Sequence, residues 1–329
     1  MFVIALAVTG VSTPWARRVA IALGFVDAPA HRKLHSTPMP LMGGLAIFLG
    51  ALVAIAFLFQ DATPIRAPQV RGTLLASGII VVVGLIDDRR GLHPLLKLGG
   101  QLLGVAVLIF FNIHVRLPLP IWANYLITAV WLVGISNAIN FLDNMDGLSA
   151  GISAVSAGFI LLIAALNGQY LVGGVAAAVL GACVGFLRYN FRPAQIFMGD
   201  AGALFLGFLL AVTGLQLEFP TQPLLVTWMV PIFLLGVPIF DTSLVVISRL
   251  RRGVRPWTAG KDHASHRLVR LGMSQREAVM TLYLGNVASG MIAIFLTRAN
   301  LMEGYFVAAG AMLTALYFIW QLETKASVE

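Results

Sequence analysis

Apolar residues run along this chain in long, unbroken stretches that are separated by short polar segments. There are about eleven stretches of roughly 17 to 24 residues, the length that a helix needs to cross the hydrocarbon of a bilayer. They cover residues 2–24, 43–60, 72–87, 95–113, 121–140, 148–166, 170–187, 200–217, 224–248, 279–297 and 300–321. Barrel strands would instead alternate apolar and polar residues over about ten positions. The pattern therefore predicts an all-α polytopic membrane helical bundle with about 10–11 transmembrane helices.

The composition excludes several other classes of protein. Of the 329 residues, 59% are hydrophobic and 11% are charged, and the mean hydropathy is +0.89. These values are far too apolar for a soluble globular enzyme or a disordered chain. The single cysteine, Cys183, cannot form a disulfide framework. Arg17 and Arg18 follow the apolar part of the first stretch without a small-residue cleavage pattern, so we expect a retained helix and not a cleaved signal peptide.

The basic residues divide unequally between the two sides of the predicted bundle. The net charge is +8, and numbering the loops alternately leaves few of the 22 Lys and Arg residues on one side: Arg66, Arg71, Arg116 and Arg298. Since cations gather in cytoplasmic loops, the other side is predicted to be cytoplasmic and the N-terminus to lie outside. Nucleic-acid binding is a poor alternative, because the most basic segment is short and is tied to the membrane at both ends.

We therefore expect residues 1–329 to form one integral membrane domain in the cell inner (plasma) membrane. Its cytoplasmic loops are predicted at residues 25–43, 87–97, 137–147, 188–200 and 249–278. All aspartates except Asp61 fall on this side, although acids contribute little to orientation. Carboxylates next to Arg, Lys and His fit a metal-assisted site for a phosphorylated, water-soluble substrate. Helix caps and solvated loops are the alternative.

Two adjacent acids, Asp87 and Asp88, end an apolar helix in the segment GLIDDRRGLHPLLK. Adjacent side chains on a helix diverge by about 100°, so these carboxylates are predicted to serve different partners and not to share one proton. Two anions at a helix C-terminus also oppose the helix dipole, which predicts a compensating Mg²⁺ or lysine. The alternative is a helix C-terminus that carries charged side chains without a functional role.

A polar stripe occupies the segment NAINFLDNMDG, residues 137–147. Asn137, Asn140 and Asp143 are spaced by three and lie along one side of a helix. Polar groups at a membrane helix end are costly unless they are used, so a ligand site is favoured over interhelical hydrogen bonding.

Asp200 lies between glycines at a predicted helix N-terminus, in FMGDAGALFLG. The helix dipole favours a negative charge there, and an ordinary N-cap is one interpretation. The other is a Mg²⁺ ligand, because Mg²⁺ takes one or two carboxylates together with waters and substrate phosphate oxygens.

The first cytoplasmic loop, VDAPAHRKLHSTPMPLMGG, combines cations with prolines and glycines. His31 and His35 could be interpreted as a zinc pair, but a third ligand is missing nearby. Lys33 and its neighbours are therefore predicted to contact a phosphate or a base.

The last cytoplasmic loop, SRLRRGVRPWTAGKDHASHRLVRLG, is strongly basic and would neutralise a diphosphate or an anionic head group. His263 and His266 are three residues apart, close enough to face one ligand. Asp241, in PIFDT, lies inside an apolar run and is either a functional group or a satisfied structural carboxylate.

Taken together, these segments resemble the polyprenyl-phosphate N-acetylhexosamine-1-phosphate transferase family, in particular its bacterial undecaprenyl-phosphate GlcNAc-1-phosphate transferase branch. Six motifs occur in the order of the family: DAPAHRKLHSTPMPLMGG, GLIDDRRGLHPLLK, NAINFLDNMDGL, FMGDAGALFLGF, PIFDT and DHASHRL. The resemblance implies a multi-helix membrane enzyme with a cytoplasmic active site.

The resemblance implies a role for each matching residue. Asp200 would be the main Mg²⁺ ligand and Asn140 a second one, with Mn²⁺ as an alternative ion. Asp87 and Asp88 match the paired acids that orient or deprotonate the lipid phosphate, and Lys97 matches a lysine that meets a phosphate.

Other residues match the donor side of such a site. Asp143 and Asp146 match acids near the nucleotide, and with the preceding pair they complete the predicted catalytic set. His263 and His266 match the outer positions of an HxHH loop motif, in which Ser265 stands where a histidine is more usual. The remaining predicted substrate-binding residues are Lys33, Asn137, Arg188 and Arg267.

The implied reaction transfers a HexNAc-1-phosphate, GlcNAc-1-phosphate above all, from a UDP-N-acetylhexosamine to polyprenyl phosphate and releases UMP. A MurNAc-pentapeptide-type phosphotransferase is one alternative. A transporter or flippase for an anionic lipid or nucleotide sugar is another. The sequence leaves the choice between a monomer and a homodimer open.

Overall fold

The computed structural model describes residues 1–27, 38–60, 67–258 and 260–326, and nearly all of them are helical. The chain divides into two compact units, Met1–Glu218 and Phe219–Glu329. The helices of unit 1 are α1 (Phe2–Leu23), α2 (Gly43–Gln60), α3 (Ala67–Arg90), α4 (Pro94–Phe110), α5 (Ile121–Leu142), α6 (Leu148–Leu166), α7 (Tyr170–Asn190) and α8 (Gly199–Leu215). Strands β1 (Val26–Asp27) and β2 (Met39–Pro40) form a short antiparallel pair in the same unit.

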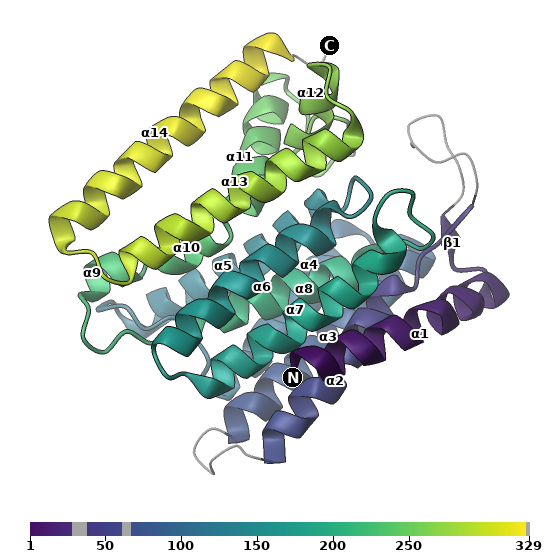
Figure 1. The fold of residues 1–329 in the computed structure, drawn as a ribbon, viewed down its shortest axis with the longest axis horizontal. Coiled ribbons are helices and arrows are strands. Elements are labelled where there is room, and N and C mark those ends of the chain that lie inside the picture. The colour runs from purple at the N-terminus through teal and green to yellow at the C-terminus, as the bar shows by residue number, and fades with distance from the viewer. Residues whose placement is uncertain (28–37, 61–66, 259, 327–329) are drawn as a thin grey trace. The chain divides into compact units, whose positions relative to one another are not determined.

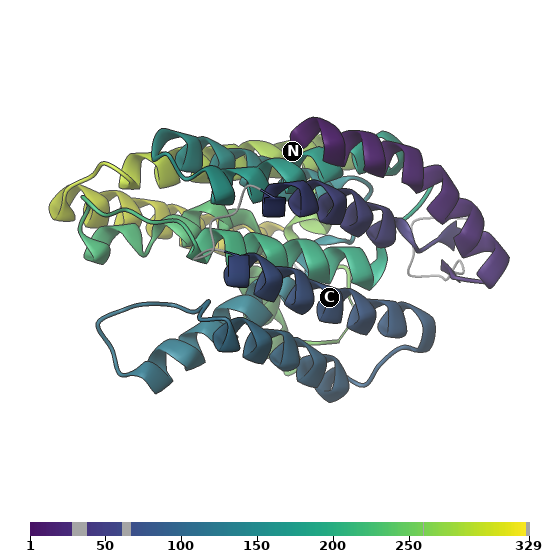
Figure 2. The same cartoon turned by 90° about the horizontal axis from the view of Figure 1, so that it is seen from below.

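The core of unit 1 is built around α8. Nearly every residue of this helix is buried, as expected for a helix that is apolar on all sides. Helices α2, α3, α5 and α6 pack against it, and α7 packs against α1, α2 and α6. Figures 1 and 2 show α3 and α4 side by side within the unit.

Short connections bring polar helix ends together at one side of unit 1. Helices α3 and α4, α5 and α6, and α7 and α8 follow one another after gaps of a few residues. The C-terminal ends of α3, α5 and α7 therefore lie on the same side as the N-terminal ends of α4, α6 and α8 (Figure 1). This is the side that carries most of the predicted site residues of unit 1.

Unit 2 contains α9 (Leu224–Thr227), α10 (Val230–Leu234), α11 (Gly236–Arg251), α12 (Ala264–Arg270), α13 (Gln275–Leu296) and α14 (Leu301–Lys325). The expected single helix over residues 224–248 is broken, because Leu224–Leu234 and Gly236–Arg251 meet at an angle of 74°. Pro238 explains the break: proline cannot donate to the carbonyl four residues earlier, and its ring clashes with that residue, Leu234.

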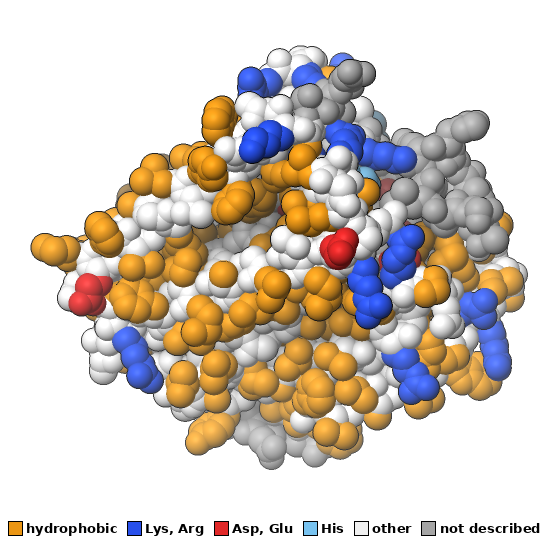
Figure 3. Space-filling view, turned by 45° about the horizontal axis from the view of Figure 1, so that its top comes forward, with side chains coloured by type: hydrophobic (Ala, Val, Ile, Leu, Met, Phe, Trp, Pro, Cys, Tyr) orange, Lys and Arg blue, Asp and Glu red, His pale blue; other side chains and the backbone are white. Residues whose placement is uncertain are grey.

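The all-α polytopic membrane bundle is confirmed, since every predicted apolar stretch is helical. Among the described residues, six helices are long and apolar enough to cross a membrane, and the bent pair could form a seventh span. Three apolar helical segments, Gly43–Leu58 of α2, Pro94–Phe110 and Gly199–Leu215, have 17 residues or fewer and rise at most about 25 Å. Hydrophobic side chains spread over most of the visible surface, whereas Lys and Arg gather in patches (Figure 3).

Candidate active site

Lys97 stands at the centre of a cluster of oxygen atoms in unit 1. Its Nζ lies 2.5 Å from Asp200 Oδ2, 2.8 Å from Asp87 Oδ2 and 3.3 Å from Asn140 Oδ1. The Asn140 side-chain amide donates to Asp200 Oδ1 at 2.8 Å. Residues from α3, α4, α5 and α8 thus converge on one ammonium group.

The tight connection between α3 and α4 explains how Asp87 and Lys97 meet. Gly91 takes a left-handed conformation with φ 63°, and the Leu92 amide donates to Asp87 Oδ1 at 2.6 Å. The chain then re-enters a helix at Pro94, whose missing N–H costs nothing in a first turn. Lys97 therefore lies in the first turn of α4, opposite the last turn of α3.

Asp88 faces a different partner from Asp87, as the divergence of neighbouring helical residues predicts. Its carboxylate accepts the backbone N–H groups of Asp200 and Ala201, which belong to α8. Asp200 is therefore not the N-cap of its own helix, and its carboxylate is left for Lys97 and Asn140. Each carboxylate oxygen of Asp88 therefore accepts one backbone N–H group.

Asp143 and Asp146 follow α5 at the same side of the unit. Asp146 Oδ2 accepts the Ala194 amide at 3.1 Å. The pKa of the half-buried Asp143 carboxyl is raised to about 8, first because the surrounding protein desolvates it. The negative charges of other site carboxylates, Asp200, Asp88 and Asp146, contribute to this rise in pKa. Additional positive charge near these acids, such as that of a bound cation, would therefore lower the pKa of Asp143.

Asn137 lies deeper along α5 and is bonded within the protein. Its side-chain amide donates to Gln101 Oε1 at 3.0 Å and to the Val133 carbonyl at 2.8 Å. Gln101 was not among the predicted site residues, although a buried glutamine one turn after Lys97 in an apolar helix is itself a signal.

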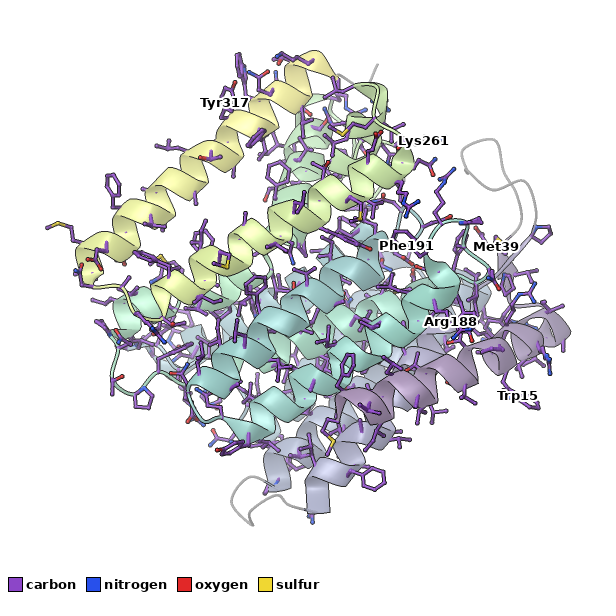
Figure 4. The ribbon with its side chains drawn as sticks, viewed as in Figure 1. Trp15, Met39, Arg188, Phe191, Lys261 and Tyr317 are labelled. Atoms are coloured by element: carbon purple, nitrogen blue, oxygen red, sulfur yellow. The ribbon has the colours of Figure 1, made fainter. Side chains whose placement is uncertain are left out.

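Of the two remaining predicted cations of unit 1, Arg188 is among the described residues. Arg188 is exposed near the C-terminal end of α7, and its guanidinium carbon lies 5.9 Å from the centre of the Tyr189 ring (Figure 4). Lys33 falls outside the described residues.

In unit 2, Asp241 holds the predicted histidine loop. Its Oδ2 lies 2.7 Å from Nδ1 of His263, and its Oδ1 accepts the Ala264 amide at 2.7 Å. Asp241 is thus a satisfied buried carboxylate, one of the two interpretations left open by the sequence. The ring of His266 has its centre 5.9 Å from that of His263. Desolvation, followed by the charge of His263, lowers the pKa of His266 to about 4, so His266 is neutral at pH 7.

Arg267 is fully buried and is surrounded by partners from its own unit. Its guanidinium donates to the backbone carbonyls of Asp262 and Leu322 and to the Ser248 hydroxyl, and it pairs with Glu323. This geometry favours a structural role over the predicted direct contact with substrate.

A second buried ion pair lies beside it. Arg249 makes two hydrogen bonds to Asp262, at 2.8 and 2.7 Å, and Arg252 adds a third at 2.8 Å. Desolvation opposes ionisation of Asp262, but the hydrogen bonds and charge of Arg249 outweigh it and lower its pKa to about 2.

The donor set of the Lys97 cluster suits a divalent cation of the Mg²⁺ type. No group of three or more His, Cys, Asp or Glu side chains with metal-binding geometry occurs in the described ranges. Mg²⁺ does not require one, since it prefers oxygen ligands and is commonly held by one or two carboxylates, waters and substrate phosphates. Two carboxylates and an amide oxygen already surround one cation here, the Lys97 ammonium.

The chain is similar to known proteins over most of its length. Residues 70–218 match the family model described as Glycosyl transferase family 4. A probable undecaprenyl-phosphate N-acetylglucosaminyl 1-phosphate transferase of Bacillus subtilis is 37% identical, over 93% of this chain and 87% of that protein. A decaprenyl-phosphate N-acetylglucosaminephosphotransferase of Mycolicibacterium smegmatis is 33% identical, over 86% of this chain and 78% of that protein. An undecaprenyl-phosphate alpha-N-acetylglucosaminyl 1-phosphate transferase of Escherichia coli K12 is 28% identical, over 85% of this chain and 78% of that protein.

Proposed function

Because the chain belongs to glycosyl transferase family 4, we propose that it transfers GlcNAc-1-phosphate from UDP-GlcNAc to undecaprenyl phosphate, a polyprenyl phosphate. The observation that carries this proposal is the convergence of Asp87, Asn140 and Asp200 on one cationic group in a membrane bundle. We place the reaction in the plasma membrane of a bacterium, with the site on the cytoplasmic side where the nucleotide sugar is available.

In the proposed reaction, a phosphate oxygen of the lipid attacks the β-phosphorus of UDP-GlcNAc. The bond from that phosphorus to the bridging oxygen breaks, UMP leaves with the oxygen, and the sugar remains on a lipid diphosphate. One phosphoanhydride replaces another, so the reaction is expected to be close to equilibrium and reversible by UMP.

The site residues divide this work between them. The second pKa of a phosphate ester is about 6, so the lipid phosphate is largely ionised at neutral pH and needs alignment more than a strong base. Asp87 and Lys97 would align it, because Lys97 can pair with either a carboxylate or a phosphate. Asp143 and Asp146 would face the nucleotide.

Asp200, with Asn140 beside it, would hold a Mg²⁺ ion. When bound, Mg²⁺ offsets the negative charge of the donor diphosphate. His263 and His266 of unit 2 would contact the donor sugar, and Lys33 and Arg188 would contact remaining phosphate oxygens.

Release of UMP tests the proposal directly. The purified protein in detergent is supplied with MgCl₂, undecaprenyl phosphate and, in parallel, UDP-GlcNAc, UDP-GalNAc or UDP-MurNAc-pentapeptide. We expect UMP from UDP-GlcNAc only when lipid phosphate and Mg²⁺ are both present. Equal turnover of all three donors would refute the assigned donor, and no UMP from any of them would refute the enzyme assignment.

A further inference from the structure

The N-terminus of α8 obtains its cap from a residue more than a hundred positions earlier in the chain. The residue before the helix, Met198, provides no side-chain cap. Instead Asp88 Oδ1 accepts the Asp200 N–H at 2.7 Å, and Asp88 Oδ2 accepts the Ala201 N–H at 3.1 Å. The first turn of a helix leaves such N–H groups without partners, and a carboxylate satisfies them while also complementing the helix dipole.

Two glycines make room for this contact. Gly199 has φ 70°, and a Cβ placed on it would lie 2.6 Å from Asp88 Oδ2 and 2.7 Å from the Leu41 carbonyl oxygen. Gly84 precedes Asp88 by one turn of α3, and a Cβ there would lie 2.3 Å from the Ala201 Cα. All three distances are too short for a Cβ contact, so the approach of α3 to α8 depends on these glycines.

The contact fixes the direction of the Asp200 side chain. With its own backbone N–H held by Asp88, Asp200 directs its two carboxylate oxygens at Lys97 and Asn140. Asp88 itself has each oxygen engaged by an amide, which leaves it poorly placed to accept a proton from a substrate. Its position within the site therefore does not imply contact with the reacting atoms.

We propose that Asp88 is a positioning residue, which clamps the N-terminus of α8 and so aims Asp200 at the cation site. This inference rests on the proposed function, in which Asp200 holds the divalent cation. It differs from the expectation that Asp88 acts on the lipid phosphate directly.

The test separates the geometry of the clamp from its charge. Gly199→Ala and Gly84→Ala retain all the carboxyl groups of the site but disturb the contact between Asp88 and α8. Asp88→Asn instead removes the negative charge of Asp88. Gly168→Ala is the matched control for Gly199, because Gly168 has φ 65° and open space around it. Gly78→Ala is the control for Gly84, since it lies in the same helix with nothing within 4 Å.

Binding of Mn²⁺ in the presence of UMP is measured by calorimetry on each full-length protein, and thermal unfolding shows which variants are folded. We expect Asp88→Asn, Gly199→Ala and Gly84→Ala to weaken Mn²⁺ binding by about 10- to 100-fold, the range found when partners of a metal ligand are removed. The two control variants should bind Mn²⁺ like the wild type. If Gly199→Ala does not fold, the comparison of Gly84→Ala with Gly78→Ala decides.

Two results would overturn the inference. The first is wild-type Mn²⁺ affinity in the folded glycine variants with a loss only in Asp88→Asn, because Asp88 would then act through its charge alone. The second is an acid limb of the kcat/KM profile that disappears in Asp88→Asn and persists in Gly199→Ala, because Asp88 would then exchange a proton during turnover. Absence of UMP release by the wild type, with the expected Mn²⁺ pattern intact, would refute the proposed function and still support the clamp.

Discussion

In both units a carboxylate accepts backbone amides near the start of a later helix, but the charged residues around this contact differ between the units. In unit 1, Asp88 of α3 accepts backbone amides at the start of α8. In unit 2, Asp241 of α11 accepts the amide at the start of α12 and also contacts His263. In each case a carboxylate on an earlier helix holds a residue near the start of a later helix, Asp200 in unit 1 and His263 in unit 2, and that residue is predicted to act on a ligand.

The neighbouring charges differ in how far they are exposed. The Asp200 side chain is 33% exposed and that of Lys97 is 16% exposed, so solvent and ligands can reach this ion pair. Arg267 is fully buried, and the Arg249 and Asp262 side chains are each only 3% exposed. The ion pair of unit 1 is therefore accessible to solvent, whereas the Arg249–Asp262 and Arg267–Glu323 pairs of unit 2 are largely shielded from it.

The largest effect is expected at Asp200. Asp200→Asn keeps the shape of the side chain but removes the charge that would hold the cation, so UMP release should fall by about 1,000-fold, comparable to loss of a group that stabilises a transition state. Thermal unfolding should change little, because the side chain is partly exposed. Turnover within about tenfold of the wild type would contradict the role of this cluster in chemistry.

Replacing Arg267 should mainly lower stability, whereas replacing Asp200 should mainly lower activity. Arg267→Met removes the buried partner of Glu323 Oε1 and the donor to several backbone carbonyls, which should lower the free energy of unfolding by roughly 3 to 5 kcal/mol. Arg252→Met is the matched control, because Arg252 is 30% exposed and its ion pair should contribute less than about 1 kcal/mol. Denaturant unfolding in detergent measures both. Equal stability of the two variants would contradict this difference between the buried and the more exposed ion pair.

The ion pair of Asp262 predicts a pH dependence of stability. Its pKa is lowered from 3.8 to about 2, so its contribution is present above pH 4 and is lost as the pH falls toward 2. The difference in stability between the wild type and Asp262→Asn should therefore be constant near neutral pH and shrink over this acidic range. A difference that shrinks instead between pH 6 and 8 would assign the effect to another group.

The smallest effect is expected at the buried pair of Asn137 and Gln101. Asn137→Leu removes the donor to Gln101 Oε1, and the Gln101 Nε2 already lacks a hydrogen-bond partner among the described residues. Stability should fall by about 1 kcal/mol, and adding Gln101→Leu should restore most of it because both polar groups are then gone. A further loss in the double variant would show that the glutamine has another function.

The amino-acid sequence alone specifies local features of this protein. Long apolar stretches fix helices because each helix satisfies its own backbone hydrogen bonds in a bilayer, and the angle between neighbouring residues sends Asp87 and Asp88 to different partners. Pro238 accounts for the break near Leu235, whereas the apolar pattern predicts one continuous helix. The resemblance to the family assigned Asn140 and Asp200 to one site, and their side chains are hydrogen-bonded to each other.

The packing of the helices determines which polar groups are accessible and which are buried in contacts within the protein. Arg267 and Arg188 are both basic residues of predicted cytoplasmic loops, yet one is fully buried and the other exposed. The partner of Asp88 is a pair of backbone N–H groups, and every residue except proline offers the same group. A pattern of side chains in the sequence cannot predict such a contact, because the contact forms only when two helices distant in the chain pack together.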